Sequence, residues 1–182
     1  MLKSNFVAAL FLTGAAVFAG GHSDPDFEKS PVGEIPKWNG GAWIKMSTPQ
    51  FTAKVVEDPA KAFSGKKYLH LDNPGKTTVN VGGFPRFTCQ SGKKYTVQCK
   101  ARGTGQFNIL FIRNDKKMKN RPWTNKAQAK QIQLVPDKWQ ELKFSYVPAP
   151  EDYKMCIALS LRNGSADIDQ VTVTIEDDAA KK

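Results

Sequence analysis

The chain of 182 residues is poor in the side chains that most enzymes use for chemistry. It has only two histidines, His22 and His70, and three cysteines, Cys89, Cys99 and Cys156. His22 lies next to the cleavage site predicted for an N-terminal signal peptide. His70 lies inside a predicted strand, where a packing role is expected. The cysteine spacing matches no zinc or haem motif. In an oxidising compartment one disulfide would leave one thiol over, and the alternative is three buried free thiols.

Acidic residues are outnumbered as well, with 17 Asp and Glu against 27 Lys and Arg and a net charge of +10. Glycoside hydrolysis needs two facing carboxylates. Asp167 and Asp169 have same-face spacing on a strand, but no acid pair can be singled out. With no nucleophile–base pair or metal triad either, we predict no catalytic residues and no enzyme activity. The positive charge favours acidic polymers, anionic lipid or cell-wall material as partners, or serves solubility alone.

Long apolar runs are absent after the start of the chain, so we predict no integral membrane span there. The one run, Phe6 to Phe18, follows a short basic start and ends in Val17-Phe18-Ala19. This pattern is typical of a secretory signal peptide. The sequence therefore predicts a signal peptide over 1–19, the alternative being an uncleaved anchor, and a secreted protein, either extracellular or periplasmic. Residues 20–178 suit one domain with its own core, and 179–182 form a polar tail.

What the chain does have is a series of short stretches in which apolar and polar residues alternate, separated by Gly, Pro, Asn and Asp. Alternation with period two is the pattern of a strand with one buried face. Many short strands at regular spacing favour two packed antiparallel sheets. The sequence thus predicts an all-β fold with about nine strands, at 52–56, 67–71, 77–81, 94–101, 106–113, 131–135, 139–147, 155–161 and 168–175.

Five short motifs follow one another along the chain. They are Asp26-Phe27-Glu28 with Ile35-Pro36-Lys37-Trp38, Ala62 to Leu69, Gly92 to Val97 with Lys100 to Gly103, Trp139 to Phe144, and Ala166 to Val171. In this order they resemble the galactose-binding-like jelly rolls of carbohydrate-binding-module families from plant-polysaccharide hydrolases. The resemblance spans nearly the whole mature chain and implies a two-sheet antiparallel jelly-roll β-sandwich. It is less specific for function, because the same sandwich also serves adhesion and protein recognition.

The resemblance also implies a structural calcium ion that joins the N-terminal segment to the last strand. Glu28 and Asp169 are the positions that match the family's ligands. Carboxylates and backbone carbonyls are the oxygen ligands that calcium takes. The closing motif departs from the family pattern, because Gln170 stands where a second acid usually does. The alternative is that Glu28 and Asp169 are ordinary surface acids.

Aromatic and basic side chains that suit a glycan concentrate in one long connection, 113–126, whose only acid is Asp115. Aromatic rings stack on the apolar faces of sugars, and the guanidinium fork matches sulfate and carboxylate geometry. Trp38 and Trp139 fall within the family-like motifs, where packing near the core is the expected role. The alternative for the connection is a solvated loop whose tryptophan caps the sandwich. The candidate ligand-binding residues are Trp123, Arg121, Arg113, Lys119 and Trp43.

Taken with the resemblance, these features predict a secreted, non-catalytic carbohydrate-binding protein that recognises extracellular polysaccharide, with an acidic polymer favoured by the charge. Basic residues interleaved with aromatics also occur in nucleic-acid-binding proteins. We do not expect a nucleic-acid partner, because the chain carries an export signal and no recognisable nucleic-acid module. The rival hypothesis is a structural or protein-interaction sandwich at the cell surface or in the matrix.

Overall fold

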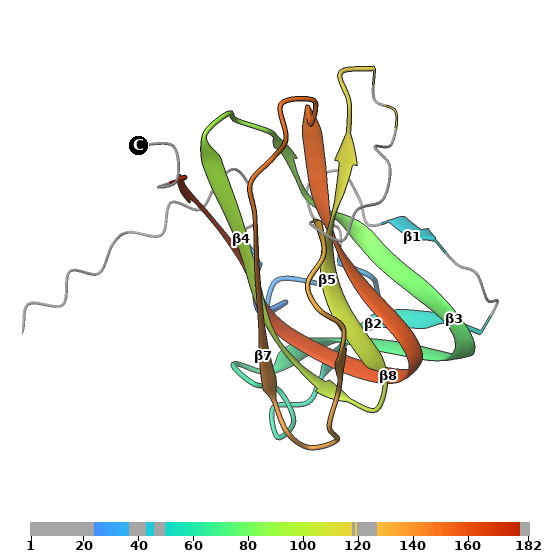
Figure 1. Ribbon diagram of the computed structural model, residues 1–182. Helices are drawn as coiled ribbons and strands as arrows, with labels where there is room; N and C mark the ends of the chain where they lie inside the picture. The colour runs from blue at the N-terminus through green and yellow to red at the C-terminus, as the bar shows by residue number, and fades with distance from the viewer. Residues whose placement is uncertain (1–23, 37–42, 46–49, 118, 120–126, 179–182) are drawn as a thin grey trace, which may run out of the picture.

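A computed structural model describes residues 24–36, 43–45, 50–117, 119 and 127–178, without the side chains of 43–45 and 83–86. All of its strand pairs are antiparallel. The described part of the chain has eight strands (Figure 1): β1 (Trp43–Lys45), β2 (Thr52–Glu57), β3 (Lys67–Thr88), β4 (Lys93–Gly103), β5 (Gln106–Asn114), β6 (Ile132–Gln133), β7 (Gln140–Tyr146) and β8 (Lys154–Asp177). The predicted all-β class is confirmed.

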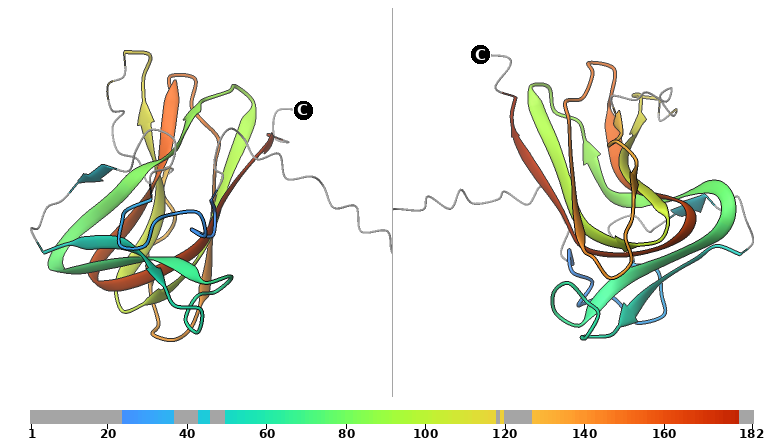
Figure 2. Two further views of the ribbon diagram at one scale, coloured as in Figure 1. Left: turned by 180° about the vertical axis from the view of Figure 1, so that it is seen from behind. Right: turned by 60° about the horizontal axis from the view of Figure 1, so that its bottom comes forward.

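Two long strands, β3 and β8, pass through both layers of a sandwich. The first half of β3 and the second half of β8 lie in the first sheet, ordered β2–β3–β8–β4–β7. Their other halves lie in the second sheet, ordered β1–β3–β8–β5–β6. Figure 2 shows the two ribbons bending together from one sheet into the other. Hydrogen bonding is therefore continuous around the bend, although the fold has two layers.

Four of the predicted strands are parts of two longer ones, because the chain bends at two places without ending the strand. Turn residues at 72–76 and 163–164 suggested strand ends, but 77–81 belongs to β3 and 155–175 runs on within β8. In β3 the pairing register shifts between Asn73 and Thr78, and the Asn73 amide donates to the Thr77 and Leu161 carbonyls at 2.8 and 3.0 Å. In β8, Asn163 and Gly164 have φ of 51° and 117°. The left-handed backbone conformation of these two residues turns the strand without ending it.

The core lies between the sheets and follows from the alternation. Tyr95, Val97, Cys99 and Ala101 share one face of β4, as predicted, and each is 0% exposed. The facing strands supply further fully buried side chains, among them Leu69, Leu71, Val79, Val81, Phe107, Ile109, Leu159 and Ile168. Each such aliphatic or aromatic side chain contributes about 1.5–3 kcal/mol through burial. This rigid double layer holds the outward-facing polar side chains in place.

The end of β4 approaches β8 closely at one glycine. Gly103 ends β4 with φ of 145°, and a Cβ there would collide with the Ser165 carbonyl oxygen, so only glycine allows this close approach to β8. All three cysteines are free thiols. The alternative of three buried free thiols therefore holds for Cys99 and Cys156, whereas Cys89 is free but only half-buried. In the described residues no helix has the length and apolar character needed to cross a membrane.

Candidate functional site

A row of polar side chains crosses the face of the second sheet that points away from the core. Val79 and Val81 of β3 are fully buried, so the alternate residue Asn80 lies on the opposite face. Asn80 pairs with Ser160 of β8, and Ser160 pairs with Asn108 of β5. Directly paired residues of antiparallel strands lie side by side on one face. The register therefore brings two carboxamides and a hydroxyl together.

This row forms the floor of a groove of about 650 Å³. One wall is the segment 128–131, which is held beside β5 because the Ala129 N–H donates to the Ile109 carbonyl at 2.8 Å. The size falls within the usual range of small-ligand sites. Among the described residues that line it none is acidic, and Lys130 is the one cation. The lining residues are Thr78, Asn80, Asn108, Gln128, Ala129, Lys130, Gln131 and Ser160.

Two acceptors in this groove have no partner within the described protein. The side-chain oxygens of Asn80 and Asn108 are buried and accept no hydrogen bond. Leaving a buried carbonyl oxygen unsatisfied costs about 1–3 kcal/mol. A fold that keeps two of them side by side across Ser160 gives up stability at this place. The groove is thus arranged to accept hydrogen bonds from a ligand that carries several donors.

Among the predicted ligand-binding residues that the structure describes, Trp43 lies on the strand that pairs with β3 beside the groove. It begins the edge strand β1, where its backbone pairs with Gly82, and Lys45 pairs with Asn80. These pairs place the β1 backbone at the edge of the second sheet, beside the part of β3 that holds Asn80. Trp123 and Arg121 lie outside the described residues. The groove residues themselves were missed, because a polar residue at an alternating position resembles any solvated strand face.

Arg113 is not on an exposed loop. Its side chain is 8% exposed and points into the core side of β5, where Nη1 donates to the Tyr146 hydroxyl at 3.3 Å and lies 3.5 Å from an Asp152 carboxylate oxygen. Tyr146 in turn donates to Asp152 at 2.6 Å. Burial, and then the bond to Asp152, raise the pKa of Tyr146. Arg113 thus has a structural role here, and its contact with a ligand stays a prediction.

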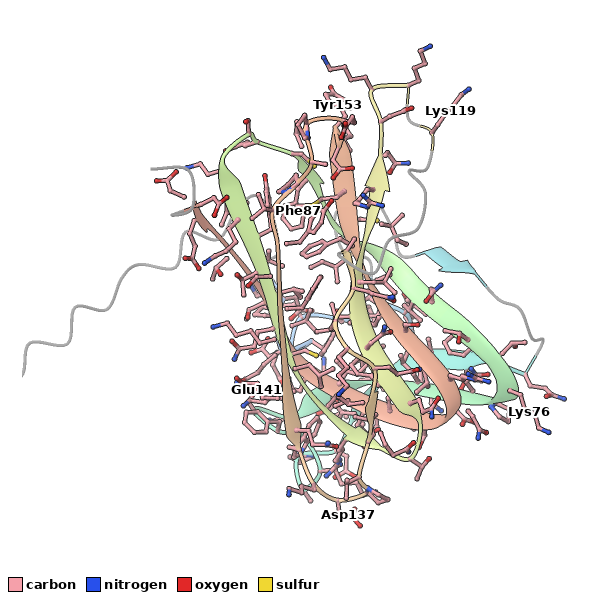
Figure 3. All side chains as sticks on the ribbon, viewed as in Figure 1. Lys76, Phe87, Lys119, Asp137, Glu141 and Tyr153 are labelled. Carbon is pink, nitrogen blue, oxygen red and sulfur yellow. The ribbon has the colours of Figure 1, made fainter. Side chains whose placement is uncertain are left out.

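Lys119 lies on the exposed loop that follows β5. The Asp115 carboxylate accepts hydrogen bonds from the Lys117 and Lys119 amides at 2.8 and 2.9 Å, and the Asp115 N–H donates to the Lys119 carbonyl. Figure 3 places Lys119 at the end of the sandwich that also carries Tyr153. This end is away from the groove, so the structure separates Lys119 from Trp43.

The proposed calcium ligands do meet at one loop. Glu28 accepts hydrogen bonds from the Lys66 and Lys67 amides at 2.6 and 2.8 Å. Asp169 is 0% exposed and accepts from the Phe63 and Ser64 amides at 3.1 and 3.0 Å. Burial raises the pKa of Asp169 to about 6, and the nearby Asp26 adds to the effect.

The donor set at this loop does not fit a calcium ion as it is arranged. The carboxylates face N–H groups, and the Lys67 ammonium donates to the Glu28 and Ser30 carbonyls at 3.0 Å each. Calcium requires six to eight oxygen ligands. The described residues also hold no group of three or more His, Cys, Asp or Glu placed to bind a metal. Calcium at Glu28 and Asp169 stays a prediction.

The first sheet carries a second polar cluster on its outer face. His70 Nδ1 lies 2.7 Å from one Asp167 oxygen, and Arg102 Nε donates to the other at 3.1 Å. The Arg102 guanidinium also lies 4.7 Å from the Trp139 ring centroid, and the Trp139 and Phe63 rings meet edge to face with their centroids 5.7 Å apart. Both carboxylate oxygens are engaged, so the cluster ties three strands and a loop together. Trp139 packs on this outer face and is half-buried, whereas the sequence predicted packing near the core.

Several solved carbohydrate-binding modules have a similar fold. The enzymatically active domain of tailspike protein 4 from bacteriophage CBA120 also matches (TM-score 0.63, 12% identity). The match covers 85% of the present protein but only 21% of the tailspike chain. The CBM22-1 xylan-binding domain from Paenibacillus barcinonensis Xyn10C matches 74% of this chain and 85% of its own length (TM-score 0.55, 10% identity). TmCBM61, solved in complex with β-1,4-galactotriose, matches 85% and 96% (TM-score 0.53, 12% identity). No protein-family model and no curated protein matches the sequence.

These likenesses establish the class of the fold. The chain is a two-sheet antiparallel jelly roll of the kind found in carbohydrate-binding modules, which confirms the resemblance that the ordered motifs suggested. At such identities the likeness defines the fold alone, since one sandwich serves many functions. The ligand therefore has to be argued from the groove.

Proposed function

We propose that this protein is a secreted, non-catalytic carbohydrate-binding protein that holds a segment of polysaccharide in the groove of the second sheet. The observation that carries the proposal is the pair of buried, unpartnered amide oxygens on Asn80 and Asn108. Sugar rings carry hydroxyl donors at regular spacing, and a hydroxyl that donates to each oxygen removes its desolvation cost. The xylan-binding and galactotriose-bound neighbours support a sugar as the ligand.

Two further features support a polymer with acidic substituents. Lys130 is a cation on the groove wall, and the described lining of the groove holds no acid. Arg162 is exposed on the same face of β8, next to the Asn80 row, and pairs with Thr78. A carboxylate on the sugar would gain from both cations, whereas a neutral polymer relies on the amides and Ser160. Trp43, at the edge of this face, is the residue proposed to stack on a sugar ring.

The test is retention of the purified protein on neutral, uronic and sulfated polysaccharides at low and moderate salt. Asn80→Leu with Asn108→Leu removes both acceptors while keeping the side-chain size. We expect binding to fall about five- to 150-fold, since each of the two lost bonds is worth about 0.5–1.5 kcal/mol. The melting temperature should change little, because the loss of two unsatisfied oxygens offsets the loss of the bonds that the Asn108 NH2 group donates to the Gln128 side chain and the Ala129 carbonyl at 3.4 and 3.5 Å. Thr52→Ala, an exposed change in the first sheet, is the control.

The outcomes separate the parts of the proposal. Equal binding by the double variant and the wild type would place the ligand elsewhere. Retention that vanishes with salt for every protein alike would mean charge attraction only. Lys130→Gln should reduce the preference for uronic over neutral polymer and leave neutral binding intact. No retention on any polymer would refute carbohydrate binding and direct the search to a protein partner.

A further inference from the structure

A second pocket of about 620 Å³ lies at the end of the sandwich and shares no lining residue with the groove. Three segments form it: the turn between β3 and β4 at 89–91, residues 115–117 and 119 of the loop after β5, and the connection from β7 to β8 at 148–153. Figure 3 shows Lys119 and Tyr153 together at this end, opposite Asp137. We call it the end pocket.

Backbone hydrogen bonds tie the three segments to one another. The Tyr153 N–H donates to the Asn114 carbonyl at 2.8 Å, and the Cys89 N–H donates to the Tyr153 carbonyl at 2.9 Å. Asp115 closes its own loop by accepting two backbone amides. The end pocket is therefore formed in advance of binding, which lowers the entropy lost when a ligand orders its surroundings.

The end pocket is lined by three lysines, Lys116, Lys117 and Lys119, and by three acids, Asp115, Glu151 and Asp152. Lys116, Lys117 and Lys119 are exposed on one wall. Two of the acids in the pocket are already engaged, because Asp115 accepts backbone amides and Asp152 accepts from the Ala149 amide beside the Arg113 guanidinium. An anion that reaches this wall meets three ammonium groups.

The opposite wall is apolar and carries an aromatic ring. Pro148, Ala149 and Pro150 line it, and Tyr153 is 37% exposed. The C–H face of a sugar ring packs on such proline and tyrosine surfaces. One wall thus suits the ring of a sugar and the other suits a negative substituent on that ring.

We propose that the end pocket is a second binding site, which takes a sugar residue bearing a carboxylate or sulfate group. The inference rests on the proposed function, because it assigns the acidic units of the same polymer to a site apart from the groove. A chain held at both places gains avidity, since the second contact becomes intramolecular. A neutral polymer uses the groove alone.

The experiment measures the affinity of the purified protein for trigalacturonate and for a neutral xylan oligosaccharide of similar length. The end-pocket variant is Lys116→Gln, Lys117→Gln and Lys119→Gln together. Its matched control removes three exposed lysines elsewhere, Lys54→Gln, Lys138→Gln and Lys143→Gln. The Asn80→Leu and Asn108→Leu groove variant is measured beside them. All six lysines are exposed, so both charge variants should fold.

We expect the end-pocket variant to bind trigalacturonate about tenfold more weakly than the wild type does, because it loses three exposed charge contacts. It should bind the neutral oligosaccharide with the same affinity as the wild type. The control variant should lose less than threefold. Equal losses in both charge variants would overturn the end pocket. Loss of trigalacturonate binding only in the groove variant would overturn it too, while leaving the proposed function intact. Loss only in the end-pocket variant, with the groove variant unaffected for both sugars, would refute the groove and uphold the end pocket.

Discussion

Replacing Asp169 by asparagine removes the ionisable group that fastens the loop at 63–64 to β8. In the wild type its two oxygens accept three backbone amides, from Phe63, Ser64 and Gln170, at 3.1, 3.0 and 2.7 Å. An asparagine keeps one acceptor oxygen and turns its NH2 group toward an amide that also donates. We therefore expect Asp169→Asn to destabilise the fold by about 1–3 kcal/mol.

The pH dependence of this loss has a definite sign. Burial raises the pKa of Asp169 from 3.8 to about 6 in the folded state. A carboxyl group with a raised pKa binds its proton more tightly when folded. Its stabilising contribution is thus fully present below pH 4 and is lost as the pH rises through about 6. A shift of roughly two units corresponds to about 3 kcal/mol between these limits.

Urea unfolding of wild type and Asp169→Asn between pH 3.5 and 8 measures this contribution as the difference between their free energies of unfolding. The difference should shrink as the pH rises, in metal-free buffer. A difference that grows with pH would refute the reasoning. The same series with added CaCl2 tests the predicted calcium ion, because a cation bound to the carboxylate lowers its pKa and reverses the slope.

Three further results are expected. Gly103→Ala should lower the free energy of unfolding by more than the roughly 1–2 kcal/mol of left-handed strain, because its Cβ meets the Ser165 carbonyl. Gly92→Ala, with φ of 73° and no atom within 4 Å of its Cβ, should lose only that strain, and equal losses would contradict the collision. Arg102→Lys should move the indole NMR signal of Trp139 and cost about 0.5–1 kcal/mol, while an unmoved signal would argue against the stacking. Native protein should resist iodoacetamide at pH 8, because burial raises the pKa of the Cys89 and Cys99 thiols and Cys156 is buried. Urea should expose all three cysteines to labelling, and mass spectrometry counts the adducts.

Local patterns predicted most of the strands. Tyr95, Val97, Cys99 and Ala101 were expected on one face from alternation alone, and all four are buried in the core. This works because the side-chain period of a strand is two and needs no knowledge of its neighbours. The errors came at 72–76 and 163–164, where turn-forming residues serve a bend inside a long strand.

The site depended on contacts that no local pattern reports. Arg113 was assigned to the long connection after the strand. It lies two residues after buried Phe111 on β5, so its side chain shares the inward face and meets Asp152. Glu28 and Asp169 were paired through the family resemblance and do meet at one loop, yet their oxygens accept backbone amides. Which donors a carboxylate meets is settled by how distant segments pack.

The sequence by itself determined the all-β class, the strand alternation and the composition of the core, since each follows from residues that are neighbours along the chain. Only the tertiary structure decided that Asn80, Asn108 and Ser160 share one groove. Those residues lie on three strands, and their meeting depends on the register of β3 and β5 against β8. A shift of one residue in that register would turn the polar row into the core.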